Sequence, residues 1–210
     1  MRKTALLLTI LRVVLVTGQA VAAPLETLTQ NEFITAESLD AGLTQAGIHV
    51  TIGERYQSYY PTIRYGLGGM LEVGARFGAT TGGTGDDEKV GVLAGADLKF
   101  QVVKQTEGIP VDMAVDLSFD THIVSGKNVS ELTFSSIFSR ALPLTERGYK
   151  LSPYGGLELS VLYGSYLPDR QTDFYVFAGM EWKFTQKSMM YLELKTGEHT
   201  LGGIGVRFEY

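Results

Sequence analysis

The sequence predicts an all-β fold, a closed antiparallel β-barrel of about ten strands that crosses a lipid membrane. Apolar and polar residues alternate through most of the chain, in segments that are often about 10 residues long. Glycine is abundant, with 25 residues, and proline is scarce, with 6. Side chains on a strand alternate between two faces, and a tilted strand needs about 9–11 residues to cross a bilayer. Barrels of eight or twelve strands are the alternatives.

The N-terminus has the three parts of a secretory signal peptide. We expect cleavage after Ala22, or after Ala23 as the alternative, so that residues 1–22 are the signal peptide. Arg12 interrupts the apolar run and argues against an uncleaved anchor, because a helical span needs about 20 clean apolar residues. The three parts are the basic start Arg2–Lys3, the apolar run 5–16 and the small-residue cleavage motif Ala20–Ala22.

Two further segments complete the expected organisation. Residues 23–41 are polar without a sustained period, and we predict that they form a periplasmic leader. Residues 42–210 are predicted to form the transmembrane barrel. The chain contains no cysteine, so this domain must be stable without disulfides.

Strict alternation places the strands of the barrel. The clearest case runs from Val90 to Val102, where one row is apolar and the other contains Asp97, Lys99 and Gln101. An even number of strands suits a closed barrel, and closure pairs every backbone group inside the bilayer. In chain order, the ten predicted strands lie around Ile48–Ile52, Tyr59–Tyr65, Leu71–Phe77, Val90–Val102, Val111–Ile123, Leu132–Phe138, Leu157–Tyr163, Phe174–Phe184, Met190–Leu194 and Ile204–Tyr210.

Alternation also fits a soluble periplasmic barrel, so the surroundings need separate evidence. The polar rows mix glycine with opposite charges, aromatic residues lie near strand ends, and an export signal is present. This combination favours lipid outside and a narrow lumen filled with ion pairs. The predicted lumen charge network consists of Glu72, Arg76, Asp97, Lys99, Asp112, Asp116, Asp120, Glu158, Glu181, Lys183, Glu193, Lys195, Arg207 and Glu209.

The last predicted strand carries a short motif of glycine and aromatic residues. Gly205, Phe208 and Tyr210 resemble the C-terminal assembly signal of bacterial outer-membrane β-barrel proteins. The segments Arg64–Leu67 and Leu71–Gly74 are similar to the short periplasmic hairpins of small barrels in this superfamily. The resemblance implies insertion into the outer membrane of a Gram-negative bacterium, with the insertion machinery, outer-membrane lipid and lipopolysaccharide as partners.

Some barrels of this superfamily are enzymes, and this sequence contains residues that could serve such chemistry. His122 shares a face with Asp120 and Ser118, a set of groups that can serve acyl transfer or hydrolysis, as in lipid A-modifying barrels. Asp86, Asp87, Asp120 and His122 are similar in type to the acidic and histidine residues of the omptin proteases, so a protease site is one hypothesis. Separately, the acidic run 86–88 offers oxygen ligands for Ca²⁺. In each case a polar lumen wall or a solvated loop explains the residues more simply.

These observations define the expected function. We predict a non-enzymatic barrel with a structural or surface-interaction role and a narrow, charge-filled lumen. A small-solute, porin-like channel is the first alternative, and a barrel enzyme around His122 is the second. No cofactor or metal is expected. The net charge of −5 argues against nucleic acid as a partner, because phosphate binding needs a basic surface.

Overall fold

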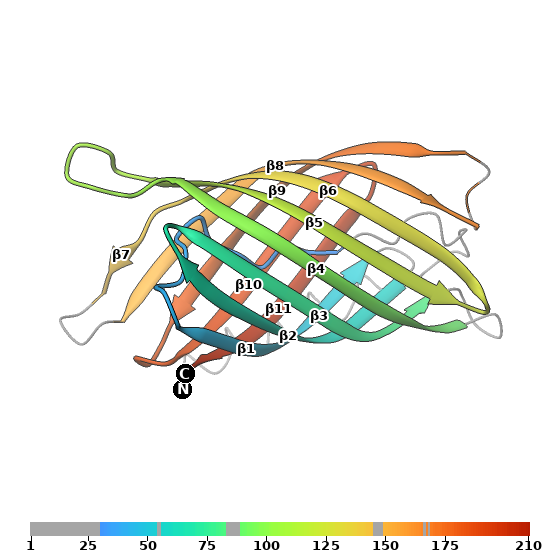
Figure 1. Cartoon of the computed structure of the whole chain (residues 1–210), viewed down its shortest axis with the longest axis horizontal. Helices are drawn as coiled ribbons and strands as arrows, with labels where there is room; N and C mark the ends of the chain where they lie inside the picture. Colours follow the sequence, from blue (N-terminus) through green and yellow to red (C-terminus); the bar gives the residue numbers. More distant parts are fainter. Residues whose placement is uncertain (1–29, 54–55, 83–88, 145–148, 166, 168) are drawn as a thin grey trace, which may run out of the picture.

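The computed structural model describes residues 30–53, 56–82, 89–144, 149–165, 167 and 169–210. Ten long antiparallel strands form a closed barrel, and a two-residue strand, β7, lies beside one end of it (Figure 1). No helix in the described part of the chain is long and apolar enough to span a membrane. The strands are β1 (Thr44–Gly53), β2 (Tyr56–Gly68), β3 (Leu71–Gly82), β4 (Lys89–Val103), β5 (Asp112–Val124), β6 (Lys127–Ser139), β7 (Leu142–Pro143), β8 (Lys150–Gly164), β9 (Gln171–Lys183), β10 (Ser188–Gly197) and β11 (Thr200–Glu209).

Two seams close the ring. β1 pairs with the last strand, β11, from Gln45 opposite Glu209 to Gly53 opposite Leu201. β6 pairs with β8 and not with the short β7 that follows it in the sequence, and β7 also pairs with β8. Every long strand therefore has a partner on both sides, which is the arrangement that satisfies backbone hydrogen bonds in lipid.

The ten strands correspond one to one with the ten predicted from alternation, and the count of ten is confirmed. The observed strands are mostly longer than the predicted ones, because pairing continues into the glycine-rich and polar ends. The short β7 was not predicted. The hairpin between β2 and β3 turns tightly through Gly68, Gly69 and Met70, which all have positive φ.

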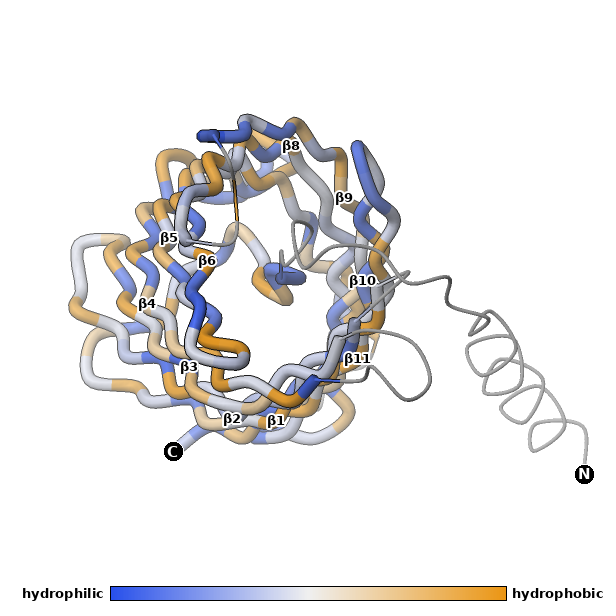
Figure 2. Tube along the Cα trace, turned by 90° about the vertical axis from the view of Figure 1, so that its right-hand side faces the viewer, coloured by the Kyte–Doolittle hydropathy of each residue, from blue (hydrophilic) through white to orange (hydrophobic). Residues whose placement is uncertain are grey.

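The barrel is apolar outside and polar inside. On β4, Val90, Val92 and Phe100 are exposed on the outer face, whereas Asp97 and Lys99 point inward and are buried. Figure 2, which looks into the ring of strands, shows the alternation of apolar and polar residues around the wall. This arrangement is the one expected for a barrel surrounded by lipid.

The N-terminal leader does not lie outside the barrel over its whole length. Gln30–Ala36 is buried, and the segment runs through the interior before the turn into β1 (Figures 1 and 2). The prediction of a periplasmic leader did not anticipate that these residues lie inside the barrel. The predicted signal peptide, residues 1–22, lies outside the described residues.

Candidate functional site

Glycines make room for large side chains in the lumen. Tyr154 of β8 is paired with Gly179 of β9, and a Cβ atom at Gly179 would lie 2.3 Å from Tyr154 Cζ. Phe177 is likewise paired with Gly156, whose added Cβ would lie 2.6 Å from Phe177 Cζ. A ring of about ten strands is only modestly wider than one of eight, whose interior side chains fill. The abundant glycine of the polar rows thus permits bulky residues to point inward.

Arginine links several of the buried acids near one mouth of the barrel. This is the mouth where β1 begins and β11 ends, and it is called the chain-end mouth below. Arg64 bonds to Glu72 through Nε, and its terminal nitrogens bond to the Asp97 carboxylate at 3.1 and 2.6 Å. Lys99 Nζ lies 3.0 Å from Glu72 Oε2. Each of these side chains is no more than 8% exposed. Such a desolvated network is stable only when its charges are mutually paired.

Two further buried ion pairs lie deeper in the lumen. Arg76 of β3 binds the Asp120 carboxylate of β5 with two hydrogen bonds of 2.6 Å each. Lys195 of β10 lies 2.6 Å from a Glu158 carboxylate oxygen of β8. Bidentate arginine–carboxylate pairs combine charge with fixed geometry, so they hold the strands that carry them at a defined separation.

Of the fourteen residues predicted for the lumen network, twelve are buried. Lys183 and Glu209 are half-buried at the chain-end mouth, with Lys183 Nζ and a Glu209 carboxylate oxygen 3.6 Å apart. Asp116 is buried, and neither of its carboxylate oxygens has a hydrogen-bond partner in the described part of the chain. Sequence reasoning missed Arg64, which links the others, although its place between Ile63 and Tyr65 in an alternating strand marks it as inward-facing.

The leader is held in the lumen by a carboxylate. Glu193 of β10 accepts hydrogen bonds from the backbone N–H groups of Glu32 and Phe33, at 2.8 and 2.7 Å. The side-chain amide of Asn31 donates to the same carboxylate at 3.1 Å, and the Tyr154 hydroxyl donates at 3.0 Å. This buried carboxylate therefore has donors from both the leader and the wall.

Further wall side chains bind the leader backbone along its length. Lys99 Nζ donates to the carbonyls of Thr35 and Glu37, at 3.0 and 2.8 Å. Lys195 Nζ donates to the Gln30 carbonyl. Three wall acceptors receive backbone N–H groups at 3.0 Å each: Ser139 Oγ from Ala36, Gln101 Oε1 from Ser38 and Glu72 Oε2 from Leu39.

Phe33 anchors the leader. Its side chain is fully buried, its ring meets the His49 ring edge-on at 4.7 Å, and its φ of +47° lies in the left-handed region. A bulky residue adopts that conformation at a cost of about 1–2 kcal/mol, so the surrounding contacts must stabilise it. The ring tip lies against Gly203 of β11, where an added Cβ would be 2.2 Å from Phe33 Cζ.

Replacing Gly203 with valine should expel the anchor from its pocket. The new side chain would occupy the space of the Phe33 ring tip, and the leader would lose its seat although its own sequence is unchanged. A single cysteine at Ala36, which is fully buried, reports the change. We expect this thiol to resist a water-soluble maleimide in the parent barrel and to react in the Gly203→Val variant. Equal protection in both folded proteins would contradict the assigned position of the leader.

The opposite end of the lumen is apolar. Five buried residues form one cluster there, close to the strand ends that are remote from both chain ends of the barrel. Leu167 packs against the cluster. An apolar cluster thus lies at this mouth, and a separate buried cluster that includes Phe33, Leu93 and Ile137 adds apolar contacts elsewhere in the lumen. The five residues are Tyr56, Val124, Val129, Leu162 and Leu201.

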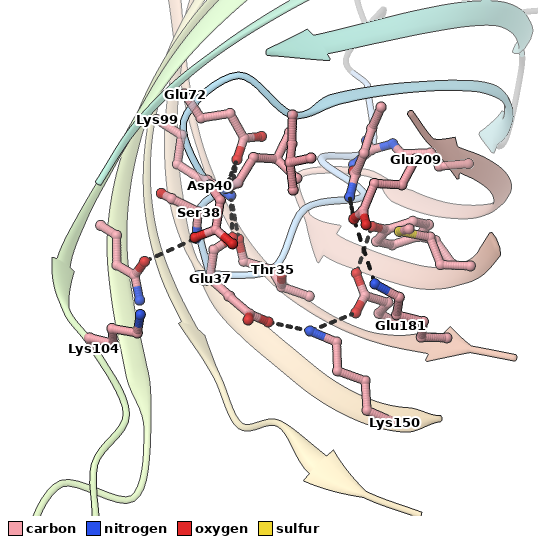
Figure 3. A pocket seen from close by; sticks show the side chains of 18 residues that line it. Thr35, Glu37, Ser38, Asp40, Glu72, Lys99, Lys104, Lys150, Glu181 and Glu209 are labelled. Carbon is pink, nitrogen blue, oxygen red and sulfur yellow. Dashed lines mark hydrogen bonds and ion pairs between the residues drawn. The ribbon is translucent and has the colours of Figure 1, made fainter. Parts of the chain in front are cut away.

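A cavity of about 170 Å³ opens at the chain-end mouth (Figure 3). Leader residues Glu37, Ser38 and Asp40 line one side of it, and wall residues that include Lys150 and Glu181 line the other. Lys150 bonds to Glu37 and lies 3.8 Å from a Glu181 oxygen, so it joins the leader to the wall. The leader therefore forms part of the boundary of this vestibule.

His122 does not form an acid–base pair with the residues predicted to assist it. Its side chain is fully buried, and neither ring nitrogen has a hydrogen-bond partner among the described residues. Asp120 binds Arg76 instead. The acidic run 86–88, considered for Ca²⁺ and for a protease site, lies outside the described residues. Within the described part of the chain, no group of three or more acidic, histidine or cysteine residues is placed to hold a metal ion.

The predicted assembly signal lies on the closing strand. Gly205 faces the lumen and is paired with His49 on one side and Tyr191 on the other. Phe208 is 45% exposed on the outer face, and Tyr210 is 70% exposed at the chain end. These positions leave the two aromatic side chains accessible from outside the barrel.

Together, the closed antiparallel ring, the apolar exterior and the polar lumen define the fold of the bacterial outer-membrane β-barrel proteins, and this chain has that fold. The β-domain of the Bordetella autotransporter BrkA superposes with a TM-score of 0.50 at 12% identity, over 81% of this chain and 100% of that one.

Two other similar solved structures are also bacterial barrels. An outer-membrane channel from Pseudomonas putida F1 has a TM-score of 0.45 at 13% identity, over 87% of this chain and 100% of that one. The N-terminal β-barrel domain of Pseudomonas aeruginosa OprF has a TM-score of 0.40 at 13% identity, over 82% and 100%. No protein-family model and no curated protein matches the chain.

Proposed function

We propose that this protein is an integral barrel of a Gram-negative outer membrane, with a lumen closed to solutes and a structural or surface-interaction role. The observation that carries the proposal is the occupied lumen. The leader fills part of it, ion pairs such as Arg76–Asp120 extend from its wall, and an apolar cluster lies at the mouth remote from the chain ends. A continuous water-filled path is what a channel requires.

A small-solute channel is the second candidate. The polar lumen wall and the vestibule of about 170 Å³ at the chain-end mouth favour it. In that case, the leader and the apolar cluster would have to move for a solute to pass. A barrel enzyme around His122 receives no support from the position of Asp120, which is engaged by Arg76.

Conductance separates the first two candidates. The purified full chain, inserted into a planar lipid bilayer, should show no stable single-channel conductance steps. The reason is that the leader, the buried ion pairs and the apolar cluster each obstruct the lumen at a different depth. Insertion must be demonstrated independently, by protection of the strands from protease. Reproducible, ion-selective steps from inserted protein would instead establish the channel.

The location and the assembly partners can be tested through the last strand. Loss of the last three residues, Phe208–Tyr210, should leave the chain in the periplasm for degradation, because the proposed insertion signal is removed. The parent protein should fractionate with the outer membrane and change its gel mobility on boiling. The matched control is Glu209→Gln, which alters the same segment but keeps both aromatic residues. Normal insertion of the truncated chain would show that the likeness of Gly205, Phe208 and Tyr210 to an assembly signal has no functional meaning here.

A further inference from the structure

The lumen binds the leader mainly through its backbone. Between residues 30 and 39, five backbone N–H groups and four backbone carbonyls are bonded by wall side chains. The N–H groups belong to Glu32, Phe33, Ala36, Ser38 and Leu39, and the carbonyls to Gln30, Asn31, Thr35 and Glu37.

The wall supplies donors and acceptors where the backbone of an irregular, non-helical segment needs them. Carboxylates, a hydroxyl and an amide oxygen accept from the N–H groups, and the ammonium groups of Lys99 and Lys195 and the hydroxyl of Tyr60 donate to the carbonyls. Every polypeptide carries these backbone groups, whatever its side chains. The set of contacts therefore matches a class of ligand, a polypeptide segment without regular secondary structure, rather than one particular sequence.

One side chain adds selectivity. Phe33 is the large residue of the leader that enters a pocket of its own, against His49 and above Gly203. Tyr60 contributes a hydroxyl 3.5 Å from the Asn31 carbonyl beside this pocket. The site thus pairs general backbone recognition with one aromatic anchor, and this combination recurs in peptide-binding proteins.

The leader is joined to the barrel by a short exposed turn. Ala41 and Gly42 are exposed, and Gly42 has a φ of +85° with open space around it. A tether of this length keeps the segment at an effective concentration on the order of millimolar, so even a modest intrinsic affinity keeps the site filled.

We propose that the lumen is a binding site for a polypeptide segment without regular secondary structure that carries an aromatic anchor, and that residues 30–39 are its tethered occupant. A free polypeptide with an aromatic anchor competes with residues 30–39 for this binding site. This inference goes beyond the structural or surface role, because it assigns a ligand class to the interior of the barrel.

Cutting the tether after folding turns the leader into a free ligand. A specific protease site is inserted between Ala41 and Gly42, the full chain is folded, and the exposed turn is then cleaved. The barrel thus forms with its native occupant in place. The N-terminal fragment, carrying a fluorophore, is followed by size-exclusion chromatography and by anisotropy in detergent. The matched control carries the same site between Ser125 and Gly126, at the opposite mouth, where cleavage leaves the leader attached.

At micromolar protein, we expect the released fragment to stay with the barrel and to exchange with excess synthetic peptide of residues 30–40. Two altered peptides test the mode of recognition. A Phe33→Gly peptide loses the anchor, and a peptide methylated on the Phe33 nitrogen loses the N–H that Glu193 accepts. Each should compete about ten- to a hundredfold less well, as expected for a lost aromatic contact or a lost bond to a charged group.

Three results would overturn the proposal. One is immediate loss of the fragment from a barrel that stays folded. Another is retention with no exchange against excess peptide. The third is competition by both altered peptides as strong as that of the native one. Since conductance is measured on the uncut chain, failure here is distinct from failure of the closed-lumen proposal.

Discussion

Replacing Arg76 with alanine should destabilise the barrel by about 3–5 kcal/mol, because it leaves the Asp120 carboxylate buried without its cation. Arg76 and Asp120 are 8% and 1% exposed, and two hydrogen bonds of 2.6 Å join them. The quantity to measure is the free energy of unfolding in urea, in lipid vesicles, with tryptophan fluorescence as the signal.

The double variant Arg76→Ala/Asp120→Ala is the control for this prediction. It removes both charges, so it should be more stable than Arg76→Ala alone despite the second truncation. Together with the single variant Asp120→Ala, these proteins complete a double-mutant cycle, which gives the coupling free energy between the two side chains. A loss below about 1 kcal/mol for Arg76→Ala, within the range of an exposed ion pair, would mean that water enters this part of the lumen.

An arginine at Ala96 should cost about 2–4 kcal/mol, the penalty for this residue at the bilayer midplane. Ala96 lies in the middle of β4 on the exposed face. Val102 is on the same face near the strand end and is 53% exposed, so Val102→Arg is the matched control and should cost about 0–1 kcal/mol. Equal costs at the two depths would exclude a bilayer around this face.

Single cysteines test the same orientation chemically. The chain has no native cysteine, so each thiol can be followed alone. Ala96→Cys should react with a lipid-phase reagent and resist a water-soluble one. Asp97→Cys, which replaces a buried inward-facing residue, should escape the lipid-phase reagent. The reverse pattern would mean that the inner and outer faces are interchanged.

The strands could be predicted from the sequence because a membrane barrel imposes one rule on every strand. The outer row faces lipid and must be apolar, whereas the inner row is free to be polar or small. This gave the positions of all ten long strands and of residues such as Asp97 and Lys99. The rule contains no information about which inward-facing charges meet, since partners such as Arg76 and Asp120 are 44 residues apart.

The leader could not be placed in the lumen by the same reasoning. Its contacts are made largely by backbone groups, which every residue carries, so they leave no period in the sequence. Its buried large apolar residues, Phe33 and Ile34, are adjacent in a mostly polar stretch, so they give no alternating pattern. The complementary signal lies on the wall, where Gly203 leaves space for the ring, but its partner becomes evident only in three dimensions.

The leader's seat is assembled from distant strands, and this has a consequence for the order of folding. Phe33 and Glu193 are 160 residues apart, and Gly203 belongs to the strand that closes the ring. The binding site for the leader is complete only when β11 has paired with β1, so the full set of leader contacts forms only once the ring has closed. Contacts absent from a transition state slow unfolding and do not speed folding. We therefore expect the leader contacts to slow unfolding and so to lengthen the lifetime of the finished barrel.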